Sequence, residues 1–187
     1  LEGIRAVPYR LEQAAGWQPV LPQPLPDRLR AIVAVHPNNP TGNLFSESVV
    51  QKIVDAVGEQ DGLVVFDEAY QPFSSRTWMP KLATHEHVLV LRTLSKFGLA
   101  GVRIGYLIGP AALITEVDKV RPPYNVSVLN AECALFALEH SDTFAAQARE
   151  IVAQRDWLCA QLAAVPGLQV FHSDANMILV RLPGGAQ

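Results

Sequence analysis

Short runs of apolar residues recur along the first half of the chain, and polar turns or helical stretches separate them. The runs are AIVAV at 31–35, GLVVF at 62–66 and HVLVLRT at 87–93. Apolar runs of this length, rich in β-branched residues and bounded by turn residues, are typical of buried strands. VRIGYLIG at 102–109 predicts a fourth strand, antiparallel because its connection to the third is short.

The stretch between the first two strands has a helical period instead. Ser46 is a good N-cap residue, and the apolar residues after it repeat at helical spacing on one stripe. The stripe consists of Val49, Val50, Ile53, Val54 and Val57. Apolar strands alternating with amphipathic helices predict an α/β fold with three layers, in which helices cover both faces of a mostly parallel sheet.

The second half of the chain changes character. Helical patterns at 110–120, 126–140 and 142–165 are followed by two strand-like pieces around a turn in LQVFHSDANMILVRL. We therefore expect residues 1–140 to be part of a large domain and 141–187 part of a smaller α+β C-terminal domain. The segment at 17–29 carries four prolines and predicts an irregular surface connection.

Composition narrows the class of protein. Apolar residues make up 49% of the 187 residues and charged residues 18%, which is typical of a globular chain. The formal net charge of −3, without a basic block, argues against nucleic-acid and anionic-membrane partners. No apolar run is long enough to span a membrane, and the start lacks a signal-peptide layout, so we expect a cytoplasmic protein.

Two cysteines, Cys133 and Cys159, lie far apart in helical stretches and lack the spacing of metal ligands. They predict buried free thiols and no metal site. The chain starts without Met and stops just after an apparent strand. Both ends therefore look cut.

Three polar residues follow the ends of the first three predicted strands. Asn39, Asp67 and Lys96 are 28 and 29 residues apart, close to the length of one strand–helix–strand unit. Right-handed crossovers would bring all three to the carboxyl edge of a parallel sheet, where ligands of α/β proteins bind. Taken singly, Asn39 also fits a turn, Asp67 a loop or cap, and Lys96 a solvated surface charge. Their joint spacing favours a site.

The motifs around these residues resemble a known family. HPNNPTG, VVFDEAY and RTLSKFGLAGVRIGYLIG, in this order, are similar to fold-type I pyridoxal-phosphate aminotransferases of class I/II. Within that family, RPPYNVSVLNAECALFAL and SDANMILVRL resemble the histidinol-phosphate aminotransferase branch. The resemblance covers nearly the whole chain, and the combination of motifs is far more specific than any one of them.

The resemblance implies roles for residues at the predicted sheet edge. Lys96 is similar to the lysine that holds pyridoxal 5'-phosphate as an internal Schiff base and later moves the substrate's α-proton. Asp67 matches the carboxylate that keeps the pyridine nitrogen protonated. Tyr70 and Asn39 match the two groups that hydrogen-bond the phenolic oxygen of the cofactor.

Further residues match the family's phosphate-binding group. Thr93, Ser95 and Arg103 look like two hydroxyl donors and one charged donor to the phosphate, with GLAG giving the backbone clearance. Tyr124 fits either a substrate contact or packing. Asn176 fits a substrate contact or, preferably, a turn at the strand entrance.

Other conspicuous side chains receive structural interpretations. Arg181 falls outside the motif that carries the family's carboxylate-binding arginine and is interpreted as a solvated strand end. His36 is interpreted as structural, and Trp17, Trp78 and Trp157 as packing residues.

The activity implied by the resemblance is transamination between an amino acid such as glutamate and a 2-oxo or keto partner, with imidazole-acetol phosphate of histidine biosynthesis as the favoured partner. A homodimer is implied for the full-length protein. Complete family members carry further segments at both ends, so this chain alone is expected to be poorly active or inactive. Two alternatives remain: another reaction with the same cofactor, such as decarboxylation of an amino-acid phosphate or aromatic transamination, and a non-catalytic fragment that keeps the fold.

Overall fold

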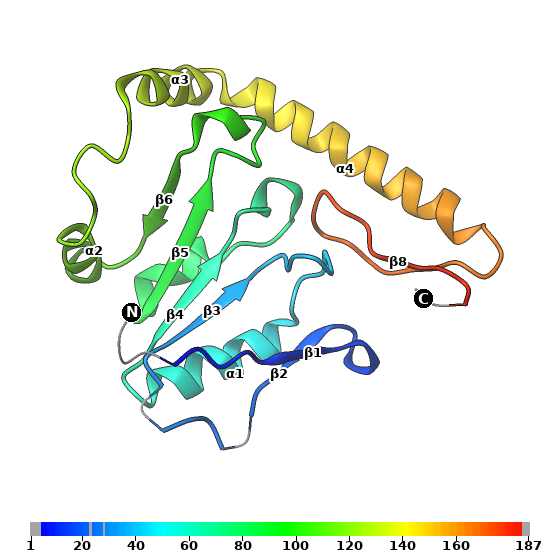
Figure 1. The fold of residues 1–187 in the computed structure, drawn as a ribbon, viewed down its shortest axis with the longest axis horizontal. Coiled ribbons are helices and arrows are strands. Elements are labelled where there is room, and N and C mark those ends of the chain that lie inside the picture. Colours follow the sequence, from blue (N-terminus) through cyan, green and yellow to red (C-terminus); the bar gives the residue numbers. More distant parts are fainter. Residues whose placement is uncertain (1–4, 23, 28, 185–187) are drawn as a thin grey trace.

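A four-stranded mixed sheet forms the centre of the computed structural model, which describes residues 5–22, 24–27 and 29–184 (Figure 1). Its strands are β3 (Ala31–Val35), β4 (Leu63–Asp67), β5 (Val88–Thr93) and β6 (Gly105–Ile108), adjacent in that order. β3, β4 and β5 are parallel, whereas β6 is antiparallel to β5. The predicted strands, their directions and the α/β class are confirmed.

One face of this sheet is buried against α1 (Glu47–Gly58). The Oγ of Ser46 accepts a hydrogen bond from the Val49 amide at 3.3 Å, so the predicted N-cap is confirmed. The helix buries its apolar stripe on strand residues such as Phe66, which is fully buried. Trp78, in the connection between β4 and β5, stacks on the Phe66 ring at a centroid distance of 4.6 Å. The same connection contains the 3-10 helices η2 (Gln71–Phe73) and η3 (Met79–Thr84).

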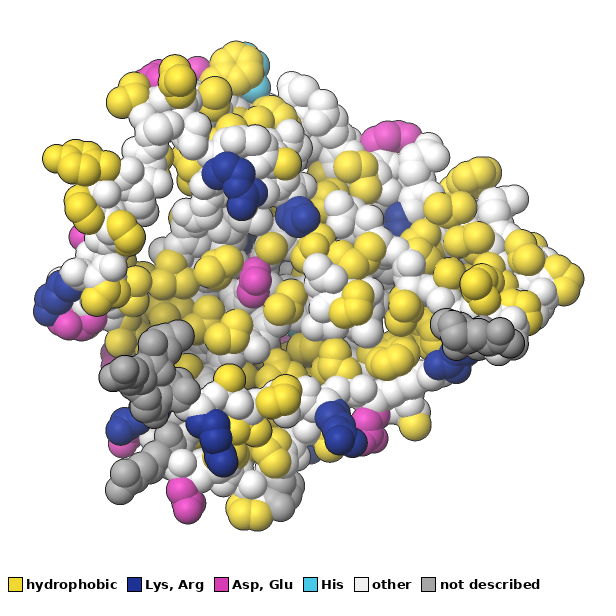
Figure 2. All heavy atoms as spheres, viewed as in Figure 1, with side chains coloured by type: hydrophobic (Ala, Val, Ile, Leu, Met, Phe, Trp, Pro, Cys, Tyr) yellow, Lys and Arg dark blue, Asp and Glu magenta, His cyan; other side chains and the backbone are white. Residues whose placement is uncertain are grey.

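The opposite face of the sheet is only partly covered in the described part of the chain, where Leu89 is 3% exposed. Val33 is 58% exposed and Leu91 36% exposed, although both are apolar and lie in the sheet. Strand side chains alternate between faces, and the helices after β6 do not lie over these positions. Figure 2 shows hydrophobic side chains spread widely over one side of the molecule, with charged residues scattered among them.

The opening of the chain is more regular than its prolines predict. β1 (Arg10–Glu12) and β2 (Gln18–Val20) form an antiparallel pair, joined by the 3-10 helix η1 (Gln13–Ala15). Pro19 lies within β2, where proline is tolerated because β2 is an edge strand with one unpaired row of N–H groups. The expectation of an irregular segment at 17–29 is therefore wrong for 18–20.

The second half contains the predicted helices α2 (Ala111–Asp118), α3 (Val128–Glu139) and α4 (Ser141–Ala163). A two-residue pair, β7 (Gln169–Val170) with β8 (Val180–Arg181), follows α4. In the described residues, no helix is both long and apolar enough to cross a membrane.

Two burial predictions for α3 and α4 are wrong. Cys133 is exposed and Cys159 only half-buried, so neither thiol is enclosed in a core. Trp157 is 59% exposed, in contrast to the buried Trp78 and the half-buried Trp17. Both helices leave apolar side chains open because they contact the rest of the described chain over narrow stripes.

Candidate functional site

The carboxyl ends of three parallel strands define one edge of the sheet. Val35, Asp67 and Leu91 pair across β3, β4 and β5, so Asp67 is level with the end of β3 and with Leu91 near the end of β5. Thr93 ends β5, two residues beyond Leu91. The chain then places Asn39 and Lys96 in the loops that follow β3 and β5. The sheet register therefore brings the three strand ends together, as their spacing predicts.

Tyr70 connects the candidate residues from different strands. Its hydroxyl accepts a hydrogen bond from Nδ2 of Asn39 at 2.9 Å, across 31 residues of sequence. The Nζ of Lys96, an exposed residue, lies 5.3 Å from the centroid of the Tyr70 ring. Tyr70 itself is 7% exposed and packs with Phe73 and Ala175, so its ring is a rigid base for both partners.

Asp67 stands at the junction of β4 and the following turn. Its Oδ1 accepts a hydrogen bond from the Ala69 amide at 3.0 Å, an Asx-type contact that fixes the carboxylate's orientation. The His36 amide donates to the Asp67 carbonyl at 2.9 Å, which continues the strand pairing to the edge. Asp67 is half-buried, and its carboxylate is thus held in place at the sheet edge.

Thr93, Ser95 and Arg103 form a second group beside the first. The Thr93 hydroxyl accepts from the Ser95 amide at 3.0 Å and donates to the Ile104 carbonyl at 3.1 Å. Arg103 Nη1 donates to Ser95 Oγ at 3.3 Å. Arg103 has a φ of 53°, a left-handed conformation that is uncommon for arginine and often found at functional sites. Because the Thr93 hydroxyl donates to the Ile104 carbonyl, the Ser95 hydroxyl and the exposed Arg103 guanidinium are the donors that this group offers to a phosphate.

The glycine-rich turn between Lys96 and Arg103 has a local reason for its glycines. Gly98 has a φ of 99°, and a Cβ there would lie 3.2 Å from the Phe144 ring. At Gly101, a Cβ would meet nothing within 4 Å. Glycine is required at 98 by backbone conformation and by the approach of α4, independently of any ligand.

Among the described residues, the two weaker candidates have no side-chain hydrogen bond to these groups. Tyr124 is 98% exposed with a φ of 60°, and Asn176 is exposed in the bend at 174–176. Arg181 is exposed at the end of β8, as expected, and it donates hydrogen bonds to the side chains of Gln169 and Gln13. His36 is 3% exposed, which fits a structural role; burial lowers its pKa below the usual value.

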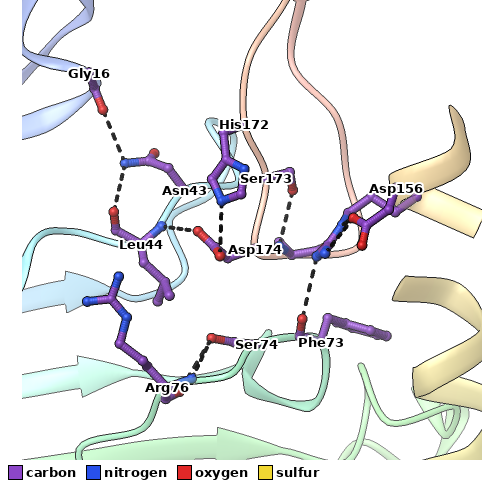
Figure 3. A network of polar contacts seen from close by, with 12 residues as sticks. Gly16, Asn43, Leu44, Phe73, Ser74, Arg76, Asp156, His172, Ser173 and Asp174 are labelled. Atoms are coloured by element: carbon purple, nitrogen blue, oxygen red, sulfur yellow. Dashed lines mark hydrogen bonds and ion pairs between the residues drawn. The ribbon is translucent and has the colours of Figure 1, made fainter. Parts of the chain in front are cut away.

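The loop after β3 is fixed by the C-terminal segment (Figure 3). Asp174 Oδ2 accepts from the Leu44 amide at 2.9 Å, and the Asp174 amide donates to the Gly42 carbonyl at 2.7 Å. Gly42 has a φ of 76°, and a Cβ there would lie 2.7 Å from Ser173 Oγ. Within the loop, the side-chain Nδ2 of Asn38 donates to Thr41 Oγ1 at 2.6 Å. The loop that carries Asn39 is therefore rigid and glycine-dependent.

Sequence reasoning missed one buried charge. Glu68, next to Asp67, has a fully buried side chain that forms an ion pair with Arg92, with 2.9 Å between Oε2 and Nη2. Both line a cavity of about 220 Å³ that also reaches Thr93 and Tyr106. The available signal was an acidic residue directly after an apolar strand and an arginine within the next one.

The arrangement fits the phosphorylated cofactor that the resemblance implies. It offers an exposed primary amine at Lys96, a fixed carboxylate at Asp67 and an anion-binding group at Ser95 and Arg103. The described residues contain no cluster of three His, Cys, Asp or Glu side chains suited to a metal ion.

The chain matches the sequence model of the family "Aminotransferase class I and II" over residues 1–186, and it belongs to that family. Dependence on pyridoxal phosphate is implied by this membership.

Individual relatives agree with the family assignment. A histidinol-phosphate aminotransferase of Polaromonas naphthalenivorans is 64% identical over 152 residues, which cover 81% of this chain and 42% of the relative. Among solved structures, an alanine aminotransferase of Pyrococcus furiosus has a TM-score of 0.78 at 25% identity, covering 98% of this chain and 51% of its own. An L-threonine-O-3-phosphate decarboxylase of Porphyromonas gingivalis has a TM-score of 0.71 at 23% identity, covering 83% and 48%, and shares the fold. The chain thus spans about half the length, or less, of the proteins it matches.

Proposed function

We propose that this chain carries the cofactor-binding part of a pyridoxal-phosphate-dependent aminotransferase. The observation that carries the proposal is the meeting of Asn39, Tyr70 and Lys96, which belong to the connections after three different strands. The amino donor is an amino acid such as glutamate. The favoured acceptor is imidazole-acetol phosphate, because the 64% identical relative is a histidinol-phosphate aminotransferase.

In this proposal, Lys96, Tyr70 and Asn39 act on one side of the site. Lys96 supplies the amine that anchors the cofactor and then carries the proton that leaves the substrate's α-carbon. Pyridoxal phosphate supplies the electron-accepting ring on which this chemistry depends. The Tyr70 hydroxyl oxygen and Nδ2 of Asn39 are 2.9 Å apart. Both would donate hydrogen bonds to the phenolic oxygen of the cofactor and so lower the proton affinity of the Lys96 nitrogen.

Asp67 and the phosphate-binding group, which consists of Thr93, Ser95 and Arg103, are proposed to contact the ring nitrogen and the phosphate of the cofactor. Asp67, oriented by the Ala69 amide, holds a proton on the ring nitrogen. Thr93, Ser95 and Arg103 bind and orient the phosphate, with the Arg103 guanidinium giving a charge-assisted contact. Tyr124 and Asn176 are proposed as weaker candidates for contact with the substrate, because neither belongs to these hydrogen-bonded groups.

The whole protein is proposed to be a cytoplasmic homodimer, and residues 1–140 and 141–187 are proposed to belong to its large and small domains. The substrates are small amino and 2-oxo acids. Because the chain spans about 42% of the 64% identical relative, we expect the isolated chain to be poorly active or inactive.

Borohydride reduction followed by peptide mapping tests the central assignment. In the whole protein, we expect the reduced cofactor to be attached to Lys96, and the Lys96→Ala variant to carry no label. Lys119→Ala, at an exposed ion pair with Glu116, is the matched control and should be labelled like the wild type. A label on any other lysine contradicts the proposal.

A decarboxylase is the second candidate, favoured by the fold shared with L-threonine-O-3-phosphate decarboxylase. Two assays discriminate the two reactions, one with histidinol phosphate and 2-oxoglutarate and one with an amino-acid phosphate such as L-threonine-O-3-phosphate. Formation of glutamate supports transamination. Release of carbon dioxide from an amino-acid phosphate, without glutamate formation, supports the alternative.

A further inference from the structure

Glu68 and Arg92 form an ion pair beneath the candidate site. Their side chains are 0% and 21% exposed. Arg92 approaches Glu68 Oε2 with two nitrogens, Nη2 at 2.9 Å and Nε at 3.1 Å. The same carboxylate accepts from Thr77 Oγ1 at 2.8 Å and from the Trp78 amide at 2.6 Å. Both carboxylate oxygens of Glu68 thus accept hydrogen bonds from other groups of the protein.

Stability alone is a weak explanation for this pair. Removing two charges from water offsets much of their mutual attraction, and an apolar pair of similar volume is often equally stable or more so. By contrast, the pair imposes a fixed geometry, because a guanidinium bonded through two nitrogens permits little rotation.

The position of the pair shows which geometry it fixes. Glu68 directly follows Asp67, and Arg92 directly precedes Thr93. The Glu68 amide donates to the Leu91 carbonyl at 2.8 Å, so the two strand ends are joined by backbone as well. Successive strand residues point to opposite faces. The pair therefore lies on the face opposite to Asp67 and Thr93 and joins the strands that carry them.

We infer that Glu68 and Arg92 are positioning residues, which set the separation and orientation of Asp67 relative to Thr93. The inference rests on the proposed function. In that function Asp67 binds the ring nitrogen, and Thr93, whose hydroxyl accepts from the Ser95 amide, holds the Ser95 and Arg103 donors that bind the phosphate of the same cofactor molecule. A rigid ligand held at two points requires anchors at a fixed spacing, and a small displacement of either weakens both contacts.

The test uses the whole protein loaded with pyridoxal phosphate. The main variant is Glu68→Met/Arg92→Met, because each single change would leave an unpaired buried charge. We expect a rise of about tenfold or more in the Kd for pyridoxal phosphate. The urea midpoint of the apoprotein should fall, because the Thr77 hydroxyl and the Trp78 amide lose their acceptor. The midpoint of the pH titration of the cofactor's visible absorption should also shift, which a purely structural role would not cause.

The matched control removes an exposed ion pair. Glu47→Gln/Lys81→Met eliminates the contact of 2.7 Å between Lys81 Nζ and Glu47 Oε1, whose side chains are 36% and 72% exposed. This control should leave the Kd, the pH titration and the unfolding midpoint unchanged.

The possible outcomes distinguish a failure of this inference from a failure of the proposed function. A folded double variant with a Kd within about twofold of wild type and an unmoved pH titration overturns the inference and leaves the proposed function intact. A wild-type protein that binds no pyridoxal phosphate overturns both. If the double variant does not fold, Arg92→Lys replaces it, since lysine keeps the charge but not the fixed two-nitrogen contact. An unchanged Kd in folded Arg92→Lys also overturns the inference.

Discussion

The two faces of the central sheet differ in both packing and chemistry. The face toward α1 buries Phe66 and Val90 completely and carries the Glu68–Arg92 pair at its edge. The other face leaves Val33 and Leu91 exposed and ends in Asp67 and Thr93. Because strand residues alternate, a single strand such as β4 supplies core residues to one face and candidate site residues to the other. One face holds the strands together, and the other presents the site.

This division predicts that the largest effect on activity comes from the partly covered face. Asp67→Asn in the whole protein should slow α-proton removal by roughly a hundredfold or more, because an amide does not hold a proton on the ring nitrogen. Unfolding free energy should change little, since Asp67 is half-buried and its Ala69 contact can be kept by an amide oxygen. The Kd for pyridoxal phosphate should rise, because the charge-assisted contact to the ring nitrogen is lost. Single-turnover kinetics with deuterated substrate measure the step. Unchanged kinetics would remove this role from Asp67.

The largest effect on stability should come from the buried face. Phe66→Ala removes a fully buried ring that stacks on Trp78, and we expect a loss of about 3–5 kcal/mol in unfolding free energy. Leu91→Ala, at a residue 36% exposed on the partly covered face, is the matched change and should cost about 1 kcal/mol or less in the isolated chain. Urea unfolding measures both. Equal losses would contradict the division between the faces.

The contrast also explains which features sequence patterns could predict. Alternation of apolar runs gave β3, β4 and β5 and the α1 stripe correctly, because one covered face is enough to produce such runs. Spacing then brought Asn39, Asp67 and Lys96 to one edge. The same patterns do not show which residues of the second face are covered, since an apolar residue such as Val33 looks identical whether or not anything covers it.

The side-chain contacts that the sequence did not predict have a different physical origin. The ion pair of Glu68 with Arg92 joins residues 24 positions apart through side-chain geometry, which no hydrophobic period encodes. The contact of Asp174 with the Leu44 amide spans 130 residues. Such contacts depend on how helices, strands and loops pack after they form. They therefore cannot be predicted from sequence patterns alone.

A smaller stability effect is expected where the C-terminal segment contacts the loop after β3. Gly42→Ala would place a Cβ 2.7 Å from Ser173 Oγ at a φ of 76°, and we expect a loss of about 1–3 kcal/mol. Gly101→Ala is the matched control, because a Cβ there meets nothing within 4 Å. Thermal or urea unfolding of both variants measures the difference. A loss at residue 101 as large as at residue 42 would contradict the close approach.

The smallest expected effect is a pH dependence from the buried face. Burial lowers the pKa of His36, and this outweighs the opposing influence of the Phe45 carbonyl. Glu68 and Asp174 also favour the charged form, whereas Arg76 opposes it. With a folded-state pKa below the unfolded value of about 6.5, the unfolded chain binds more protons near that pH.

Stability from His36 is therefore fully present above the unfolded pKa and is lost as the pH falls through it toward the folded value. The slope cannot exceed about 1.4 kcal/mol per pH unit for one group. Urea midpoints at several pH values between 8 and 5, compared for wild type and His36→Gln, isolate the contribution. We expect the wild type to lose more stability than the variant on acidification, because only the wild type must protonate a buried imidazole. Parallel losses in the two proteins would show that another group causes the acid sensitivity.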